Sequence, residues 1–413
     1  MSELNSVITD VYAIEVLDSR GNPTIEVNIT LENGIIASGI APSGASTGTK
    51  EACELRDGDK SRYCGKGVLK AVEFVNTEIN NALVGIDIQD DIDSLLIELD
   101  GTENKTNLGA NATLATSIAC WKAKAEDAGL PLFEYIGGKN ADILPTPMMN
   151  IINGGEHASN ELAIQEFMVI PHGFETFSEK LRAGTEIFHT LKNVIKKAGH
   201  TTAVGDEGGF APNFKTSKEA LDCIMQAIKD AGYQSKTEVS IALDAAASEF
   251  YKNSKYMIDG QELVTDELIA YYANLINTYP IISIEDPFHE DDTIGFQKFT
   301  EQFGNKIQIV GDDLFCTNPK LIQKGIDGKY ANALLVKPNQ IGTISETLQA
   351  VKIAQSAGFK CVMSHRSGES EDTTIAHLAV ATNCGQIKTG APCRGERTAK
   401  YNELLRIEKY LES

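Results

Sequence analysis

From residue 164 onward the sequence repeats one unit, in which a short apolar run is followed by a polar loop and a helical segment. In one helical segment Asn318 is placed to cap the helix and Pro319 fits its first turn. Apolar strands alternating with such helices are typical of a parallel sheet covered on both faces. Six or seven units favour a closed β/α barrel over an open sheet. The runs that we predict as strands are IQEFMVI (164–170), VSIALD (239–244), IISIED (281–286), IQIVGDD (307–313), ANALLVK (331–337), KCVMSHR (360–366) and QIKTG (386–390).

The beginning of the chain does not follow this pattern. Residues 7–40 alternate apolar and polar positions around the turn sequence ENG, which predicts an antiparallel meander. The stretch GGKNADILPTP, residues 137–147, contains two prolines and is predicted to be a connector. Two segments between them have a helical pattern that ends at glycine, residues 68–85 and 111–129. We therefore predict an N-terminal α+β domain over residues 1–140, followed by a β/α barrel catalytic domain over residues 141–413.

The length and charge of the chain exclude several classes of protein. At 413 residues the chain is too long for one ordinary core and suits two domains or a barrel with an appended domain. It carries 58 acidic and 37 basic residues, a net charge of −21, and no basic run. Such a field repels nucleic acids and anionic membranes, so we expect neither as a partner. The acidic excess suits carboxylates gathered for divalent cations.

The sequence also predicts a cytoplasmic location. The start, MSELNSVITD, has neither the basic flank nor the apolar core of a secretory signal. Apolar runs all fall short of the roughly 18 residues that span a bilayer. The eight cysteines are scattered without a C-x-x-C pair, a pattern that indicates reduced thiols.

The polar residues that end the predicted strands form a second pattern. One such residue per strand gives three acids followed by three bases, at spacings of 41, 27, 25, 29 and 22 residues. Each spacing matches about one βα unit, so all six side chains are expected on the C-terminal rim, where barrels build their sites. A single acid at a strand end is an ordinary helix cap or loop residue, but six charged residues at one topological point favour a functional site. The six residues are Asp244, Glu285, Asp312, Lys337, Arg366 and Lys388.

The three acids on this rim predict a metal site. Unpaired, Asp244, Glu285 and Asp312 would repel one another and take up protons, and a divalent cation would remove that cost. Ligands that are all oxygen favour magnesium or manganese over zinc. The spacing does not decide between these residues and their neighbours Asp286 and Asp313.

The three bases predict an anion site beside the metal. Lys337, Arg366 and Lys388 are expected to face the acids, and the turn SHRSGE, residues 364–369, supplies a clamp for phosphate or carboxylate. Salt bridges to the three acids are the structural alternative. Metal on one side and cations on the other describe a pocket for a small, multiply anionic substrate. In such a pocket a lysine whose pKa is lowered by the metal can act as a base.

The stretch TAVGDEGGFAPN, residues 202–213, places two adjacent acids between glycines. Glycine lets a ligand approach the backbone closely, so Asp206 and Glu207 are candidates for the same site. Solvated loop acids are the alternative interpretation.

Ten short motifs follow one another along the chain between about residues 7 and 409. They are DSRGNPT (18–24), SGASTG (43–48), GGEHASN (154–160), QEF (165–167), GDEGG (205–209), SIEDP (283–287), GDDL (311–314), NQIG (339–342), SHRSGE (364–369) and IKTGAPCR (387–394). Together they resemble the enolase (phosphopyruvate hydratase) family. The resemblance implies the reversible, magnesium-dependent dehydration of 2-phosphoglycerate to phosphoenolpyruvate in glycolysis and gluconeogenesis. It also implies an N-terminal α+β domain on a β/α barrel with irregular first strands, two Mg²⁺ ions per active site, and a homodimer.

The resemblance carries over to individual residues. Lys337 matches the base that removes the proton next to the substrate carboxylate, and Glu207 matches the acid that assists departure of the hydroxyl. Glu166 lines the side of the site where this acid acts and is counted among the catalytic residues.

The remaining matches concern the metal ions and the substrate. The ligands of the tighter magnesium match Asp244, Glu285 and Asp312. Ser46 matches a ligand of the second magnesium, on a loop that closes over the substrate. The substrate-binding residues that the resemblance implies are His157, Gln165, Glu166, Lys337, Arg366, Ser367 and Lys388.

Three other functions are compatible with parts of the pattern. A related superfamily enzyme acting on another carboxylic acid would share the metal acids, but it would have less use for the phosphate clamp and the acid of GDEGG. A Schiff-base aldolase would place its lysine in an apolar pocket without three metal acids. A structural or surface-receptor role is disfavoured because inactive relatives often lose a ligand or a base, and here all are present.

Overall fold

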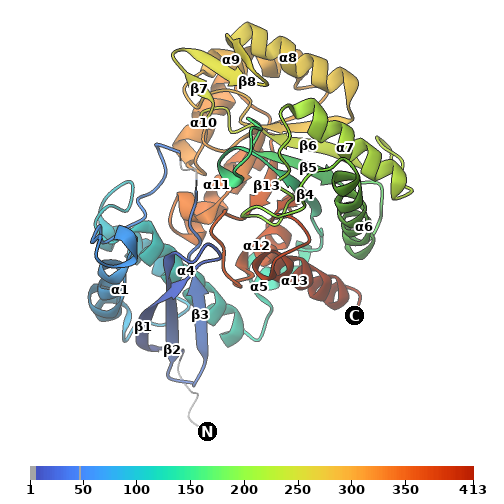
Figure 1. Cartoon of the computed structure of the whole chain (residues 1–413). Helices are drawn as coiled ribbons and strands as arrows, with labels where there is room; N and C mark the ends of the chain where they lie inside the picture. Colours follow the sequence, from blue (N-terminus) through green and yellow to red (C-terminus); the bar gives the residue numbers. More distant parts are fainter. Residues whose placement is uncertain (1–5, 46–47) are drawn as a thin grey trace.

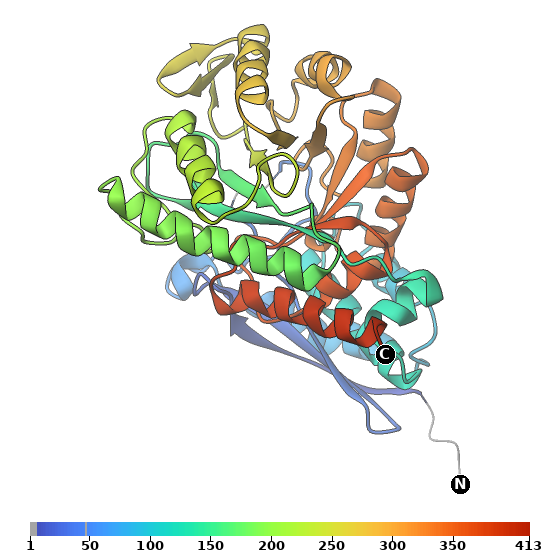
Figure 2. The same cartoon turned by 90° about the vertical axis from the view of Figure 1, so that its right-hand side faces the viewer.

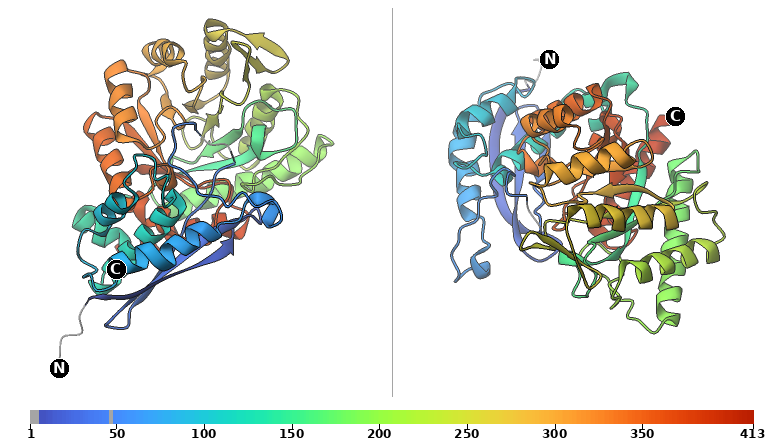
Figure 3. Two further views of the ribbon diagram at one scale, coloured as in Figure 1. Left: turned by 90° about the vertical axis from the view of Figure 1, so that its left-hand side faces the viewer. Right: turned by 90° about the horizontal axis from the view of Figure 1, so that it is seen from above.

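The computed structural model describes residues 6–45 and 48–413, which form a small N-terminal unit packed beside a larger barrel (Figure 1). Seen from above, the N-terminal sheet and its helices lie along one side of the barrel (Figure 3). Within the described residues, we find no helix with both the length and the apolar character needed to cross a membrane.

The N-terminal unit is built on three antiparallel strands, as the alternation over residues 7–40 predicts. The strands are β1 (Ile8–Leu17), β2 (Pro23–Leu31) and β3 (Ile36–Ile40). Helix α4 (Ala110–Asp127) covers β2 and β3. The approach is close, since a Cβ atom at Gly39 would lie 2.4 Å from the carbonyl oxygen of Ala115. Glycine at this position therefore lets the helix sit directly on the sheet.

Short helices complete this unit. A π-helical segment, η2, joins helices α1 and α2. The predicted helical region at residues 68–85 is thus one interrupted helix. Helix α3 has no counterpart in the sequence prediction; it begins where the Asp91 side chain accepts a hydrogen bond from the backbone N–H of Ser94. The elements are η1 (Tyr63–Gly65), α1 (Leu69–Phe74), η2 (Val75–Ile79), α2 (Asn80–Leu83), α3 (Ile92–Asp100), α5 (Leu132–Gly137) and η3 (Gly138–Asn140).

The larger unit is a closed barrel, in agreement with the prediction from the repeated strand–helix unit. Around the barrel the strands follow the order β10-β11-β12-β13-β14-β4-β5-β6. All seven predicted runs form strands of this barrel. In chain order the strands are β4 (Thr146–Asn153), β5 (Glu166–Ile170), β6 (Ser240–Asp244), β10 (Ile281–Glu285), β11 (Gln308–Gly311), β12 (Ala333–Val336), β13 (Lys360–Ser364) and β14 (Gly385–Lys388).

Two features of the barrel correct the sequence prediction. The prediction of an all-parallel sheet is wrong at β5, which runs antiparallel to both neighbours, β4 and β6. Residues 154–165 join β4 to β5 and hold only the short 3-10 turn η4 (Gly155–His157), without the helix that usually makes the crossover between parallel neighbours. The predicted connector at residues 137–147 runs into β4, because proline is tolerated near a strand start.

The helices that alternate with the later strands pack on the outside of the barrel. In chain order they are α6 (Phe177–Lys197), α7 (Ser217–Asp230), α8 (Thr265–Thr278), α9 (Thr293–Phe303), α10 (Pro319–Gly328), α11 (Ile344–Ser356), α12 (Thr374–Ala381) and α13 (Gly395–Leu411), with the 3-10 turn η5 (Pro338–Gln340) after β12. Asn318 caps α10 and Pro319 lies in its first turn, as predicted. Figure 2 shows α6 and α13 side by side along the barrel.

A small antiparallel sheet is inserted after β6, and it lies at the top of Figure 1. Its strands are β7 (Tyr251–Lys252), β8 (Lys255–Ile258) and β9 (Gln261–Leu263). The interior of the barrel is filled by apolar side chains, so the barrel is a packed core and the site must lie at its rim. These side chains are Met148, Met168, Ile170, Ala242, Val310, Ala333, Leu335 and Val362.

Polar contacts hold the N-terminal unit against the barrel. The Thr113 hydroxyl donates to the carbonyl oxygen of Gly342 over 2.9 Å. Lys105, which is 1% exposed, pairs with Glu346 over 3.0 Å. Because these contacts are buried, the loops of the N-terminal unit are held in place over the C-terminal rim of the barrel.

Candidate active site

The structure brings the six predicted strand-end residues together on one rim of the barrel. Asp244 and Glu285 are the last residues of β6 and β10 and face each other in the register, while Lys388 ends β14. Asp312, Lys337 and Arg366 lie one or two residues beyond β11, β12 and β13. The period of the βα unit thus located them correctly.

Lys388 lies at the centre of the acidic side of this rim. Its Nζ is 2.8 Å from both Glu285 carboxylate oxygens, 3.1 Å from Asp244 Oδ2 and 3.3 Å from Glu166 Oε1. Burial acts against the charge of Lys388, but the carboxylates of Asp244, Glu166 and Glu285 outweigh it and hold its pKa well above the usual range. The salt bridges considered as the structural alternative are therefore present.

The acids on this rim carry more negative charge than Lys388 balances. Burial raises the pKa of Glu285 well above its usual range, and the neighbouring charge of Asp244 adds to the effect. The carboxylates of Asp244 and Glu285 meet at Lys388 Nζ, and such buried, hard oxygen donors suit a divalent cation such as magnesium. Asp312, the third predicted ligand, contacts Lys337 and Gln340 instead, so the predicted set of three ligands stays a prediction.

Lys337 and Asp312 form a buried pair with 2.5 Å between Nζ and Oδ2. Burial lowers the pKa of Lys337, but the charge of Asp312 outweighs it, so that the pKa lies above its ordinary value. The second carboxylate oxygen of Asp312 accepts a hydrogen bond from Gln340 Nε2 over 2.8 Å. The hydroxyl of Thr317 donates to Gln340 Oε1 and accepts the backbone N–H of Lys337. The pair is thus positioned from both sides.

The neighbouring acids that the sequence left as alternatives are placed differently. Asp286 has a φ of 39°, and its carboxylate accepts backbone N–H groups from Asp312 and Asp313 over 2.9 and 2.7 Å. Carboxylate oxygens of these three residues lie within 4.8 Å of one another. Asp286 therefore holds the turn that carries Asp312, whereas Asp312 itself faces Lys337.

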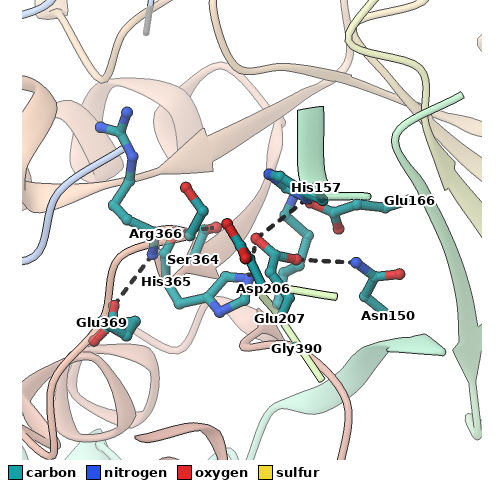
Figure 4. A network of polar contacts seen from close by, with 12 residues as sticks. Asn150, His157, Glu166, Asp206, Glu207, Ser364, His365, Arg366, Glu369 and Gly390 are labelled. Atoms are coloured by element: carbon teal, nitrogen blue, oxygen red, sulfur yellow. Dashed lines mark hydrogen bonds and ion pairs between the residues drawn. The ribbon is translucent and has the colours of Figure 1, made fainter. Parts of the chain in front are cut away.

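A second buried group surrounds Glu207, which is only 2% exposed (Figure 4). Asn150 Nδ2 donates to Glu207 Oε2 over 2.9 Å, and His365 Nε2 lies 3.3 Å from Glu207 Oε1. His157 Nδ1 lies 3.6 Å from Glu207 and 3.7 Å from Glu166. The alternative interpretation of Glu207 as a solvated loop acid is therefore wrong.

The environment pushes the pKa values of two neighbouring carboxyl groups in opposite directions. Burial raises the pKa of Glu166 well above its usual range, and the charge of Glu207 adds to this. Burial also favours the neutral form of Glu207, but the neighbouring His157, His365 and Arg397 outweigh it and hold the Glu207 pKa well below its usual range. The two neighbouring carboxyls thus differ in their preference for a proton, an arrangement typical of acid–base catalysis.

The cationic side of the rim includes a residue from the N-terminal unit. Arg366 Nη1 pairs with Glu51 Oε2 over 2.9 Å and donates to Asn339 Oδ1 over 3.0 Å. The hydroxyl of Ser367 accepts the backbone N–H of Ala45 over 2.7 Å. The loop that precedes α1 therefore joins the SHRSGE turn over the barrel.

One cavity on this rim is lined by most of the residues that the sequence predicts for the site. Its lining contains all seven predicted substrate-binding residues together with one metal acid and the acid of GDEGG. The lining residues are His157, Gln165, Glu166, Glu207, Asp244, Lys337, Ser364, His365, Arg366, Ser367 and Lys388. Ser46, the predicted ligand of a second metal ion, lies outside the described residues.

Sequence reasoning missed several residues that position this site. The pattern of strand ends gave no signal for four residues that lie on loops, inside a strand or in the turn η5, namely Glu51, Thr317, Asn150 and Gln340. Gln340 was present in the NQIG motif but had no assigned role.

Two models of known protein families match this chain. The description "Enolase, N-terminal domain" matches residues 8–136, and "Enolase, C-terminal TIM barrel domain" matches residues 141–413. The chain belongs to the enolase family. As a member of the enolase superfamily it is a lyase-type enzyme, and the carboxylates of Asp286, Asp312 and Asp313 form one of the groups in the described residues that could hold a metal ion.

Proposed function

We propose that this enzyme catalyses the reversible, magnesium-dependent dehydration of 2-phosphoglycerate to phosphoenolpyruvate, as a step of glycolysis and gluconeogenesis. The observation that carries the proposal is the single cavity in which a buried acidic cluster and three buried cations flank a pair of carboxyls with opposite pKa shifts. A substrate with one carboxylate, one phosphate and one hydroxyl leaving group matches the acidic cluster with its metal, the buried cations and the pair of carboxyls, respectively.

The metal requirement follows from the donors. Asp244, Glu285 and Asp312 would hold one magnesium, and Ser46 stays the predicted ligand of the second. Magnesium bound there would offset the negative charge that develops on the substrate carboxylate when the neighbouring proton is removed. Manganese has the same ligand preference as magnesium, and activity at equal free concentrations of each metal distinguishes magnesium from manganese.

We assign Lys337 as the base. It is buried and lines the cavity, and its ammonium is paired with Asp312. Asp312 engaged as a cation ligand no longer stabilises that ammonium, so the lysine can lose its proton and accept one from the substrate carbon.

Glu207 and Glu166 supply the proton that the leaving hydroxyl requires. Their carboxylate oxygens lie within 4.8 Å of each other in a group that includes His157. The opposite pKa shifts favour a proton on Glu166 over a proton on Glu207. We assign Glu207 as the group that delivers a proton to the hydroxyl, with Glu166 holding that proton beforehand.

The other lining residues bind the substrate. Arg366 and Ser367 suit the phosphate, because a guanidinium and a hydroxyl donate directed hydrogen bonds to its oxygens. Lys388 suits the carboxylate because it lies among the metal acids. His157 and Gln165 complete the wall around the leaving group.

A spectrophotometric assay tests this function. Purified enzyme with 2-phosphoglycerate and magnesium should form phosphoenolpyruvate, stop in excess EDTA and recover when magnesium is restored. Manganese and zinc should be compared at equal free concentration. Full turnover in excess chelator would contradict the metal assignment, and turnover of another carboxylic acid in place of 2-phosphoglycerate would favour a different superfamily reaction.

We also propose that the enzyme is a cytoplasmic homodimer. Strand β1 leaves Tyr12 and Ile14, two residues apart and hence on one face, 52% and 38% exposed. Leu17 at its end is 56% exposed, and exposed apolar patches mark contact sites between proteins. Light scattering at several protein concentrations measures the mass, and a mass of one chain at all of them would contradict the dimer.

A further inference from the structure

Arg397, in the first turn of α13, is a buried residue that lies outside the lining of the cavity. Its side chain is 0% exposed, and it is the largest fully buried side chain among the described residues. A buried guanidinium is costly unless its N–H groups find acceptors. Its partners therefore show what holds it there.

Those partners belong to two loops of the active site. Nη1 donates over 2.6 Å both to the ring nitrogen Nδ1 of His365 and to the carbonyl oxygen of Arg366. Nη2 donates to the carbonyl oxygens of Ser367 and Asp206 over 2.7 and 3.1 Å. Arg397 thus ties the SHRSGE turn to the GDEGG loop.

The contact with His365 fixes the position of the ring proton. A guanidinium has donors and no acceptor, so Nδ1 of His365 must accept and the proton of a neutral ring must lie on Nε2. Nε2 is the atom that lies 3.3 Å from Glu207 Oε1 (Figure 4). Arg397 therefore leaves Nε2, the ring nitrogen that lies near Glu207, as the atom that carries the proton of a neutral His365.

The charges around the ring act in the same direction. Burial lowers the pKa of His365 to about 4, with Glu207 acting against this and Arg397 supporting it. Glu369 also faces the ring, but it is paired with the buried Lys400 over 2.8 Å. On its other sides Glu207 faces His157 and Asn150. His365 is thus neutral at physiological pH, and its orientation depends on Arg397.

We propose that Arg397 is a positioning residue that locks His365 in the Nε2–H tautomer, so that His365 donates to the Glu207 carboxylate. The consequence for turnover rests on the proposed function, whereas the tautomer itself does not. A purely structural clamp would hold the loops together without determining which nitrogen carries the proton, and this difference can be measured.

The experiment measures the tautomer directly by NMR on the full chain labelled with ¹⁵N in its seven histidines. The variant His365→Gln assigns the signal. The intact enzyme is expected to show a protonated Nε2 and an unprotonated Nδ1 for His365 between about pH 6 and pH 8. A protonated Nδ1, or a doubly protonated ring, would overturn the proposal without any further variant.

Arg397→Ala then tests the cause. With the guanidinium gone, Nδ1 loses its donor, and the His365 signal is expected to become a mixture of tautomers or an imidazolium. Added guanidinium ion should restore the original signal. An Arg397→Ala variant that is folded by circular dichroism but keeps the unchanged Nε2–H signal would contradict the proposal.

Arg394→Ala is the matched control. Arg394 precedes the same helix, donates to the carbonyl oxygen of Ser19 and pairs with Glu396, which Arg397 also contacts. Within the part of the chain that the structure describes, Arg394 forms no hydrogen bond or ion pair with His365. This variant should leave the His365 signal unchanged. A control that shifts the signal as much as Arg397→Ala would count against a specific role for Arg397.

The kinetic arm separates this proposal from the proposed function. Arg397→Ala is expected to lower kcat by about 100-fold with little change in KM, because the acid is misplaced and the substrate contacts remain. Added guanidinium should recover part of this loss. An intact enzyme that shows the Nε2–H tautomer but forms no phosphoenolpyruvate would contradict the proposed function. The same result would still support the role of Arg397 in fixing the tautomer.

Discussion

The Asp286 carboxylate accepts a hydrogen bond from the backbone N–H of Asp312 over 2.9 Å. Asp286 and Asp312 belong to two pairs of consecutive acids, Glu285–Asp286 and Asp312–Asp313. This contact shows that the two members of the first pair have different roles. One member of the first pair faces Lys388, and the other holds the turn from which Asp312 reaches Lys337.

The first prediction concerns this turn. Asp286→Asn should weaken magnesium binding by about 10- to 100-fold, because an amide presents one acceptor where the turn needs two. Asp312→Asn should weaken it more, since it removes the ligand itself. Isothermal titration with magnesium measures both variants. Normal binding by Asp312→Asn together with lost binding by Asp286→Asn would reverse the assignment.

The second prediction concerns Glu285. Glu285→Gln should weaken the tighter metal site by removing one ligand charge, and activity should return only at raised magnesium concentration. Glu301, an exposed residue of α9, provides the control Glu301→Gln, which should bind magnesium normally. Equal magnesium affinities of the two variants would remove Glu285 from the ligand set.

The third prediction separates the base from the acid. Glu207→Gln should still exchange the substrate α-proton with deuterated water, because proton removal needs Lys337 and the metal but not Glu207. It should fail to expel the hydroxyl, since an amide has no sufficiently acidic proton to donate. Lys337→Ala should lose both exchange and product. Exchange is followed by NMR alongside product formation, and the opposite pattern would mean that the two roles are reversed.

The fourth prediction concerns the contact between the two units. Glu51→Ala should lower the free energy of unfolding by roughly 3 kcal/mol, because it removes a carboxylate that pairs with the buried Arg366 charge. The exposed pair of Lys320 and Glu103 gives a control, for which Glu103→Ala should have a much smaller effect because solvent screens an exposed ion pair. Urea unfolding measures both, and equal effects would contradict the prediction.

The fifth prediction concerns stability in acid. The hydrogen bond with His377, together with Arg406, lowers the pKa of Glu403 to about 2. A carboxyl whose pKa is lowered in the folded state stabilises the fold above its unfolded pKa, and this contribution is lost as the pH falls through the folded value. The difference in unfolding free energy between the intact protein and Glu403→Gln should therefore shrink between about pH 4.5 and pH 2. A difference that stays constant over this range would show that Glu403 keeps an ordinary pKa.

The sequence revealed those parts of the site that depend on the repeat. Asp244, Glu285 and Lys388 end strands one βα unit or more apart, so their spacing alone brings them to one rim. The direction of β5 was not predictable in this way, because an apolar run has the same pattern in either direction. The strand β4 was hidden by the prolines at its start.

The residues that hold the site in place have no such pattern. Glu51 meets Arg366 only because the N-terminal unit packs on the barrel, and Arg397 meets His365 only because α13 returns beneath the rim. These contacts join positions 315 and 32 residues apart in the sequence. Each depends on tertiary packing, which neither periodicity nor motif spacing encodes.

The closure of the barrel between β14 and β4 has a consequence for how the chain folds during its synthesis. Lys388 pairs in register with Met148, about 240 residues earlier, so this seam forms only when nearly the whole chain has left the ribosome. Until then Glu166, Asp244 and Glu285 lack their shared cation, and the first strands have an open edge. Nascent chains that end before β14 should therefore stay dependent on chaperones, and release of the last strand completes the barrel and neutralises its acids in the same event.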